Sequence, residues 1–121
     1  MLIRSQDRET LINFNNSIVV NIMGIEGFMK VVCSYSCKDF IVIGHYSSKE
    51  KAMKVLDMIQ DAYMDFEASK ITSTGLAAAA YTGSYDTLES VNGGIKVLKG
   101  YAKVIRKSVV FQMPEDGSVE V

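Results

Sequence analysis

Short apolar segments separated by turn-forming residues occupy the first 46 positions of the chain, and their spacing constrains the fold more than any other feature. Asn15-Asn16 and Cys37-Lys38-Asp39 are typical turn sequences. A parallel crossover needs a dozen or more residues, so strands joined this closely pair antiparallel. The segments expected as strands are residues 2–4, 10–14, 18–22, 28–34 and 39–45.

Alternation of side chains is clearest in residues 28–34, where Met29, Val31 and Cys33 share one face. Residues 39–45 are apolar on both faces. This pattern predicts a central strand with one face covered by a helix.

A long amphipathic helix is expected at residues 48–68, with Ser47 and Glu50 as its capping box. Its apolar residues recur at helical spacing, so the helix should lie across the sheet. Met53, Met58 and Met64 fall partly off that stripe. They either fill gaps in the core or form a partner interface, and core filling is the preferred interpretation.

Small residues dominate the next part of the chain, SKITSTGLAAAAYTGSY, which is expected either as a loop or as a small hairpin of 71–74 with 78–82. Asp86 then caps a second helix that contains Gly93-Gly94 and reaches about residue 107. A last strand, 109–113, precedes Pro114 and an acidic tail expected to be loose.

These elements predict one α+β domain over residues 1–121, an antiparallel β-sheet of five or six strands with a long helix and a second Gly-containing helix packed on it. Within it, 1–68 form the sheet and first helix, 69–107 the small-residue loop and basic helix, and 108–121 the last strand and tail.

The formal charge of −1 argues against general affinity for DNA or RNA. No signal peptide is recognisable, and no apolar run reaches the length of about 18 residues that a membrane helix needs. A protein of the cytoplasm, without membrane contact, is therefore expected. Two cysteines are too few for a secreted disulfide scaffold.

Catalytic and metal-binding patterns are absent from the sequence. His45 is the single histidine and has no nucleophile pattern around it. Cys33, Cys37 and His45 match no zinc spacing and lack a fourth ligand. We therefore expect no enzyme activity, no metal and no cofactor.

A basic segment distinguishes the second helix. Residues 91–113 contain no carboxylate, and their positive charges are Lys96, Lys99, Lys103, Arg106 and Lys107. Glycine-rich backbone and clustered cations suit phosphate groups, although the segment carries neither a P-loop nor a Rossmann fingerprint. Taken alone, the basic face is equally well explained as solvated surface. With its neighbours it predicts a pocket that binds an anionic nucleotide without turning it over.

The neighbouring side chains supply the other contacts that a nucleotide needs. Tyr81, Tyr85 or Tyr101 could stack on a base. Asn92 could bond a base edge, and the fork of donors on Arg106 could hold a phosphate. The candidate ligand-binding residues are Tyr81, Thr82, Gly83, Tyr85, Asn92, Lys103 and Arg106.

The opening MLIRSQDRETLINFNN, the segment GHYSSKEKAMKVLDMIQDAY and the ending VFQMPEDGSVEV resemble small proteins of phages and prophages of Gram-positive bacteria. With residues 69–107 added, the chain is similar in layout to the Thoeris anti-defence family of phage signal sponges. In this resemblance, Asn92 and Arg106 match the polar and basic residues that hold the ligand, and Tyr81 or Tyr85 matches the stacking surface.

The resemblance implies a non-enzymatic immune-evasion protein. Such proteins bind cyclic ADP-ribose isomers made by bacterial TIR-domain defence proteins, and hold them intact so that the effector is not activated. Some members also bind cyclic trinucleotides at separate sites in a hexamer. A homo-oligomer is expected in turn, either a dimer, which would be the minimal binding unit, or a hexamer assembled from such dimers.

Two other classes of function stay open. The first is a phage or prophage accessory protein that blocks a host protein by direct binding through a sheet edge or the first helix. The second is an enzyme that cleaves cyclic nucleotides, which has the least support in the sequence.

Overall fold

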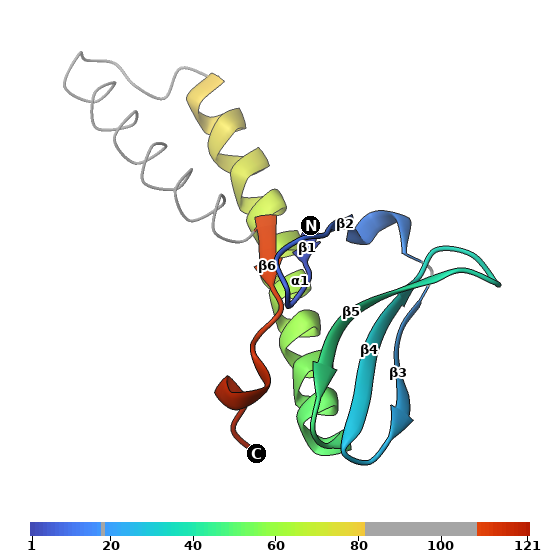
Figure 1. Cartoon of the computed structure of the whole chain (residues 1–121). Helices are drawn as coiled ribbons and strands as arrows, with labels where there is room; N and C mark the ends of the chain where they lie inside the picture. Colours follow the sequence, from blue (N-terminus) through green and yellow to red (C-terminus); the bar gives the residue numbers. More distant parts are fainter. Residues whose placement is uncertain (18, 82–108) are drawn as a thin grey trace.

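The computed structural model describes residues 1–17, 19–81 and 109–121, with residues 72–81 described by their backbone only. Two three-stranded sheets and one long helix make up this part of the chain (Figure 1). The α+β class is thus confirmed, but the expected single antiparallel sheet is wrong.

The first sheet, called the mixed sheet below, joins the beginning of the chain to its end. Its order is β2-β1-β6, where β1 is Leu2–Arg4, β2 is Leu11–Asn13 and β6 is Val110–Gln112. β1 is antiparallel to β2 and parallel to β6. The parallel pair is possible because the chain between β1 and β6 is long and contains the long helix. The expectation of purely antiparallel pairing was based only on the short turns within the first 46 residues.

The second sheet, called the antiparallel sheet below, has the order β3-β4-β5, with β3 at Val19–Ile25, β4 at Phe28–Ser34 and β5 at Phe40–Tyr46. A short 3-10 helix, Phe14–Asn16, precedes it. β4 is the central strand, so the prediction that residues 39–45 form the central strand is wrong. Phe40 is 50% exposed, so apolar residues on both faces of this strand did not mean that both faces are buried.

The two sheets are connected through the residues that follow β1. The backbone N–H of Gln6 donates to the carbonyl of Ile43 in β5 at 2.8 Å. This bond lies on the side of β5 that β4 leaves free, so the chain crosses directly from the mixed sheet to the antiparallel sheet.

The hairpin of β3 and β4 is tighter than the sequence indicated. β3 continues to Ile25, and the turn consists of Glu26 and Gly27 alone. Gly24 lies inside the strand with φ +119°, a conformation that residues with a side chain rarely adopt. A Cβ at this position would stand 2.4 Å from the carbonyl oxygen of Phe28.

The long helix α1, Lys49–Tyr81, begins one residue later than expected. The hydroxyl of Ser48 accepts the N–H of Lys51 at 3.2 Å and so caps the first turn. Ser47 was predicted as the cap, but its N–H and hydroxyl both donate to Asp116.

α1 also ends much later than residue 68. It continues through Gly75 and the four alanines to Tyr81, so the loop and the alternative hairpin expected from residue 69 are wrong. Alanine has the highest helix propensity, and an interior glycine costs only about 1 kcal/mol. The expected second helix, from Asp86 to about residue 107, lies outside the described residues.

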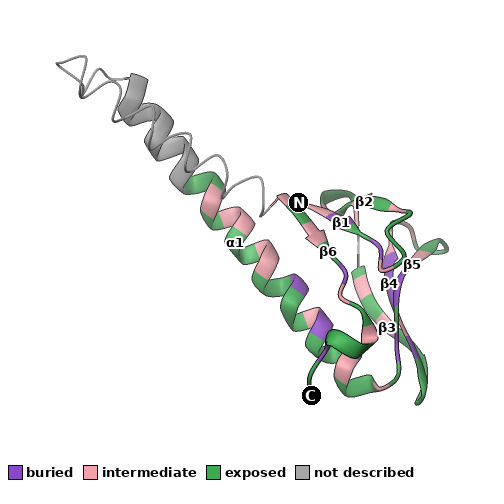
Figure 2. Ribbon diagram, turned by 60° about the vertical axis from the view of Figure 1, so that its left-hand side comes forward, coloured by how far each residue is buried: buried purple, intermediate pink, exposed green. Residues whose placement is uncertain are grey.

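The core lies between α1 and the sheets (Figure 2). Alternate residues of β4 point into it, as expected, together with one face of α1 and buried residues of β1, β5 and the C-terminal segment. The fully buried side chains are Ile3, Val31, Val32, Cys33, Ile43, Tyr46, Val55 and Met113. Beyond these contacts α1 extends past the sheets, and Ile71 is 76% exposed.

The methionines of α1 do not fill the core. Met53, Met58 and Met64 are 52%, 37% and 60% exposed. The preferred interpretation of these residues is therefore wrong. Met53 and Met64 form an exposed apolar stripe together with Ile71, whereas Met58 lies elsewhere around the helix.

The C-terminal tail is docked and not loose. A 3-10 helix at Asp116–Ser118 places Val119 in the core, where it is 5% exposed. The carbonyl of Glu120 accepts a hydrogen bond from Lys54 in α1. The contacts of the tail use the apolar side chain of Val119, the carboxylate of Asp116 and backbone carbonyls, so its acidic composition alone did not indicate the docking.

Replacing Gly24 by alanine should lower the free energy of unfolding by about 2 kcal/mol, because the new Cβ meets the Phe28 carbonyl in a backbone region that disfavours side chains. Urea denaturation followed by circular dichroism measures this. Gly117→Ala is the control, since a Cβ there meets nothing within 4 Å. Equal stability of the two variants would contradict the assigned strain.

Candidate functional site

The candidate ligand-binding residues lie at or beyond the end of the described part of α1. Tyr81 is the last residue of the helix, described by its backbone only. The other six, Thr82, Gly83, Tyr85, Asn92, Lys103 and Arg106, are outside the described residues. The described structure determines where this segment starts and where it rejoins the fold, at β6 next to β1.

One hollow of about 360 Å³ lies where the 3-10 helix and β2 meet the outer end of the antiparallel sheet. Its walls are mainly apolar, with the amides of Asn13 and Asn16 and the ring of Tyr35 as the larger polar groups. The volume is within the range of small-molecule sites. Its lining contains no Lys or Arg, so it does not provide the positive charge that a phosphate needs. The full lining is Thr10, Leu11, Ile12, Asn13, Asn16, Ser17, Cys33, Tyr35 and Ile41.

A second hollow, of about 270 Å³, lies between the loop after β1 and β5. Asp7 is the charged residue in its lining. Hydrogen bonds from the hydroxyl of Ser5 and the N–H of Glu9 hold the pKa of the Asp7 carboxyl below its usual value. The carboxylate is ionised near neutral pH, so it adds negative charge to the lining of this hollow.

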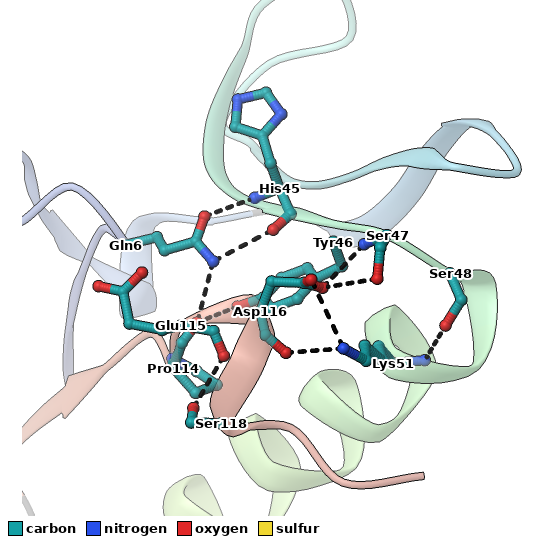
Figure 3. Close-up of polar contacts among 10 residues, drawn as sticks. All are labelled: Gln6, His45, Tyr46, Ser47, Ser48, Lys51, Pro114, Glu115, Asp116 and Ser118. Atoms are coloured by element: carbon teal, nitrogen blue, oxygen red, sulfur yellow. Dashed lines mark hydrogen bonds and ion pairs between the residues drawn. The ribbon is translucent and has the colours of Figure 1, made fainter.

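Gln6 forms the polar junction beside the second hollow (Figure 3). Its amide oxygen accepts the N–H of His45 at 2.9 Å, while its amide nitrogen donates to the carbonyls of His45 and Pro114, each at 3.1 Å. The hydroxyl of Tyr46 also donates to the Pro114 carbonyl, at 2.9 Å. Burial raises the pKa of the Tyr46 phenol, so its hydroxyl remains protonated as a donor. This junction is structural: its donors and acceptors are engaged with one another.

Asp116 joins the tail to the start of α1. It accepts the N–H and the hydroxyl of Ser47 at 2.8 and 3.1 Å, and its other oxygen lies 3.5 Å from the ammonium group of Lys51 (Figure 3). The backbone N–H of Ser47 contributes most to lowering the pKa of Asp116, followed among the favourable contacts by the Ser47 hydroxyl and Lys51. A carboxylate at this position also suits the positive end of the helix dipole.

The residues weighed as metal ligands are separated. Cys33 is buried in β4, where burial raises the pKa of its thiol, whereas Cys37 is exposed in the following turn. His45 points away from the junction, and its ring lies 5.2 Å from that of Phe28. Within residues 1–17, 19–81 and 109–121, no three His, Cys, Asp or Glu side chains are placed to hold a metal ion.

The structure reveals one feature that the sequence did not indicate and one that it indicated only weakly. The Gln6 junction joins residues 108 positions apart, so no local signal could have found it. The exposed apolar residues on the outer face of β3 and β4, Met23, Ile25 and Phe28 among them, had a weak signal in the alternation of the strands.

No protein-family model, curated protein or solved structure matches this chain. In the part of the chain that the structure describes, no helix is both long and apolar enough to cross a membrane.

Replacing Gln6 by alanine should lower the free energy of unfolding by about 1 to 3 kcal/mol, because it removes three hydrogen bonds, two to the backbone of His45 and one to the partly buried carbonyl of Pro114. Thermal or urea unfolding measures the loss. Gln60→Ala, on the exposed side of α1, removes the same side chain without these bonds. A Gln6 variant as stable as the Gln60 variant would overturn the structural role of the junction.

The lowered pKa of Asp116 predicts a dependence of stability on pH. Its ionised contacts stabilise the fold fully above the pKa of about 3.9 that an unfolded aspartate has, and this contribution is lost as the pH falls through the lower pKa of the folded state. Urea denaturation from pH 7 to pH 2.5 should show the wild type more stable than Asp116→Asn at neutral pH and equal to it in acid. Asp61→Asn, an exposed carboxylate of α1, controls for net charge. A constant difference across the range would contradict the assignment.

Proposed function

We propose that this chain is a non-enzymatic phage immune-evasion protein that binds and sequesters cyclic nucleotide immune signals. The signals are cyclic ADP-ribose isomers, with cyclic trinucleotides as a second class. Binding without turnover keeps the signal from its bacterial effector, and no cofactor takes part.

The carboxylate-free segment 91–113 carries this proposal. Five positive charges occur there without a negative one, in a chain whose formal charge is −1. The hollows at β2 and at the loop after β1 have no Lys or Arg in their linings, and the second contains an ionised aspartate. The basic segment is therefore the better candidate for binding a phosphate-bearing ligand, through Asn92, Lys103 and Arg106.

Stacking on an aromatic ring would complete the recognition of the base. Tyr81 ends α1, and Thr82, Gly83 and Tyr85 follow it directly in the sequence. We assign the stacking surface to Tyr81 or Tyr85, in keeping with the resemblance described above. Sequestration needs stoichiometric, tight binding and no chemical step, which agrees with the lack of any catalytic pattern in the sequence.

Isothermal titration with a panel of cyclic ADP-ribose isomers and cyclic trinucleotides tests the proposal. We expect saturable binding of at least one ligand, and chromatography after heat release should return that ligand unchanged. Absence of binding by every ligand would overturn the proposal. Recovery of a cleaved product would assign the protein to the enzymes instead.

Reversing the charge at Arg106 should weaken binding by about a hundredfold or more, because a buried or partly buried phosphate would face a carboxylate. Arg106→Glu is compared with Lys38→Glu, which reverses an exposed charge in the turn between β4 and β5. Both variants change net charge equally, so a loss confined to Arg106→Glu assigns the effect to the site. Equal affinities would contradict a role for Arg106.

The exposed stripe on α1 favours one alternative, a protein that blocks a host partner by direct binding. Met53, Met64 and Ile71 recur at spacings of 11 and 7 residues and are all at least half exposed. In that case the ligand panel gives no binding, and Met53→Glu with Met64→Glu abolishes the protein complex.

A further inference from the structure

The outer strand of the antiparallel sheet has an unpaired edge without the usual protection. β3 is seven residues long, VVNIMGI, and contains no charge and no proline. β4 pairs with one of its sides, and nothing in the described residues pairs with the other. Soluble proteins normally shield such an edge with charges, proline, a bulge or a covering element.

The register of the hairpin identifies the free backbone groups. Ile25 and Phe28 flank the two-residue turn and pair with each other, so the odd-numbered residues of β3 exchange hydrogen bonds with β4. The N–H and C=O groups of Val20, Ile22 and Gly24 therefore point to the free edge. The Ile22 N–H supports this assignment, because it donates to the side chain of Asn21 at 2.8 Å and not to β4.

The outer-face residues of β3 are also exposed. Val19, Met23 and Ile25 are 48%, 43% and 76% exposed, and Phe28 beside Ile25 in β4 is 55% exposed. The inward residues Val20 and Ile22 pack against the core. The edge thus combines free backbone groups with apolar side chains on one face.

We infer that β3 pairs antiparallel with β3 of a second copy of this chain, about a two-fold axis at Ile22. This is the register in which all seven residues of each strand are paired, since positions 19 and 25 then lie opposite each other. Ile22 faces Ile22 of the second copy and Val20 faces Gly24, which are the residues with free backbone groups. The two small sheets become one continuous six-stranded sheet.

The same register brings the exposed apolar side chains together. Val19 lies directly opposite Ile25 of the second copy, and Phe28 of that copy is the next residue along the row. By symmetry this cluster occurs twice. Cross-strand apolar pairs of this kind stabilise sheets, and the lack of charge on β3 means that the two-fold axis places no like charges opposite each other. In the pair, the Ile22 N–H would donate to a backbone carbonyl of the second copy instead of to the side chain of Asn21.

Opposite charges at the two facing positions test the register. Val19→Lys with Ile25→Lys, and Val19→Glu with Ile25→Glu, each place like charges together in the pair. Within one chain these positions are about 20 Å apart, so the charges do not interact there. Sedimentation velocity without nucleotide should show wild-type dimers, at least tenfold weaker association of each variant, and recovery of dimers when the two variants are mixed.

Leu11→Lys is the matched control, because Leu11 is 50% exposed but lies in β2 of the mixed sheet. If a double variant fails to fold by circular dichroism, Val19→Lys and Ile25→Glu repeat the test singly: each alone places a charge opposite an apolar residue and weakens association, and mixing them places the new lysine opposite the new glutamate and restores dimers. A wild type that is monomeric at tens of micromolar, variants that associate like the control, or a mixture that does not recover would each overturn the inference. Since no ligand is present, this outcome is independent of the titration that tests the proposed function.

Discussion

The carbonyl oxygen of Pro114 accepts hydrogen bonds from Gln6 and from Tyr46, and the rest of the structure depends on the closure made there. These bonds lie next to the parallel pair of β1 and β6, which places Ile3 and Met113 in the same core as Val55 of α1. Because β1 and β6 are near opposite ends of the sequence, their pairing holds the two ends of the intervening chain next to each other. The basic segment is consequently tethered at α1 on one side and at the mixed sheet on the other.

Fold and proposed binding function occupy different parts of this chain. The described residues supply a closed core, two hollows whose linings lack Lys and Arg, and a polar junction whose groups are already engaged with one another. The positive charge that an anionic signal needs is concentrated in residues 91–113. A free strand edge at β3 provides a third surface, which is suited to self-association. The two proposals therefore place self-association and ligand binding in different regions, both outside the core.

Local patterns predicted the elements well where the signal was local. The bounds of β1 and β4 match the expectation, and the others differ by one to three residues, because alternation and turn residues act over only a few positions. The length of α1 was underestimated because Gly75 and its polar neighbours resemble a loop, although the four alanines that follow sustain a helix. Six of the seven candidate binding residues lie outside the described residues, so the proposed site rests on residue types and on the resemblance.

The sequence by itself determined the α+β class, the order of the strands along the chain, the buried faces of β4 and α1, and the position of the charge. Each of these follows from periodicity or composition within a few turns or strands. Only the tertiary structure decided the parallel pairing of β1 with β6, the docking of the tail through Asp116 and Val119, and the exposure of the α1 methionines. The reason is physical: these features depend on which distant surfaces meet, and a backbone carbonyl such as that of Pro114 carries no side-chain signal that identifies its donors.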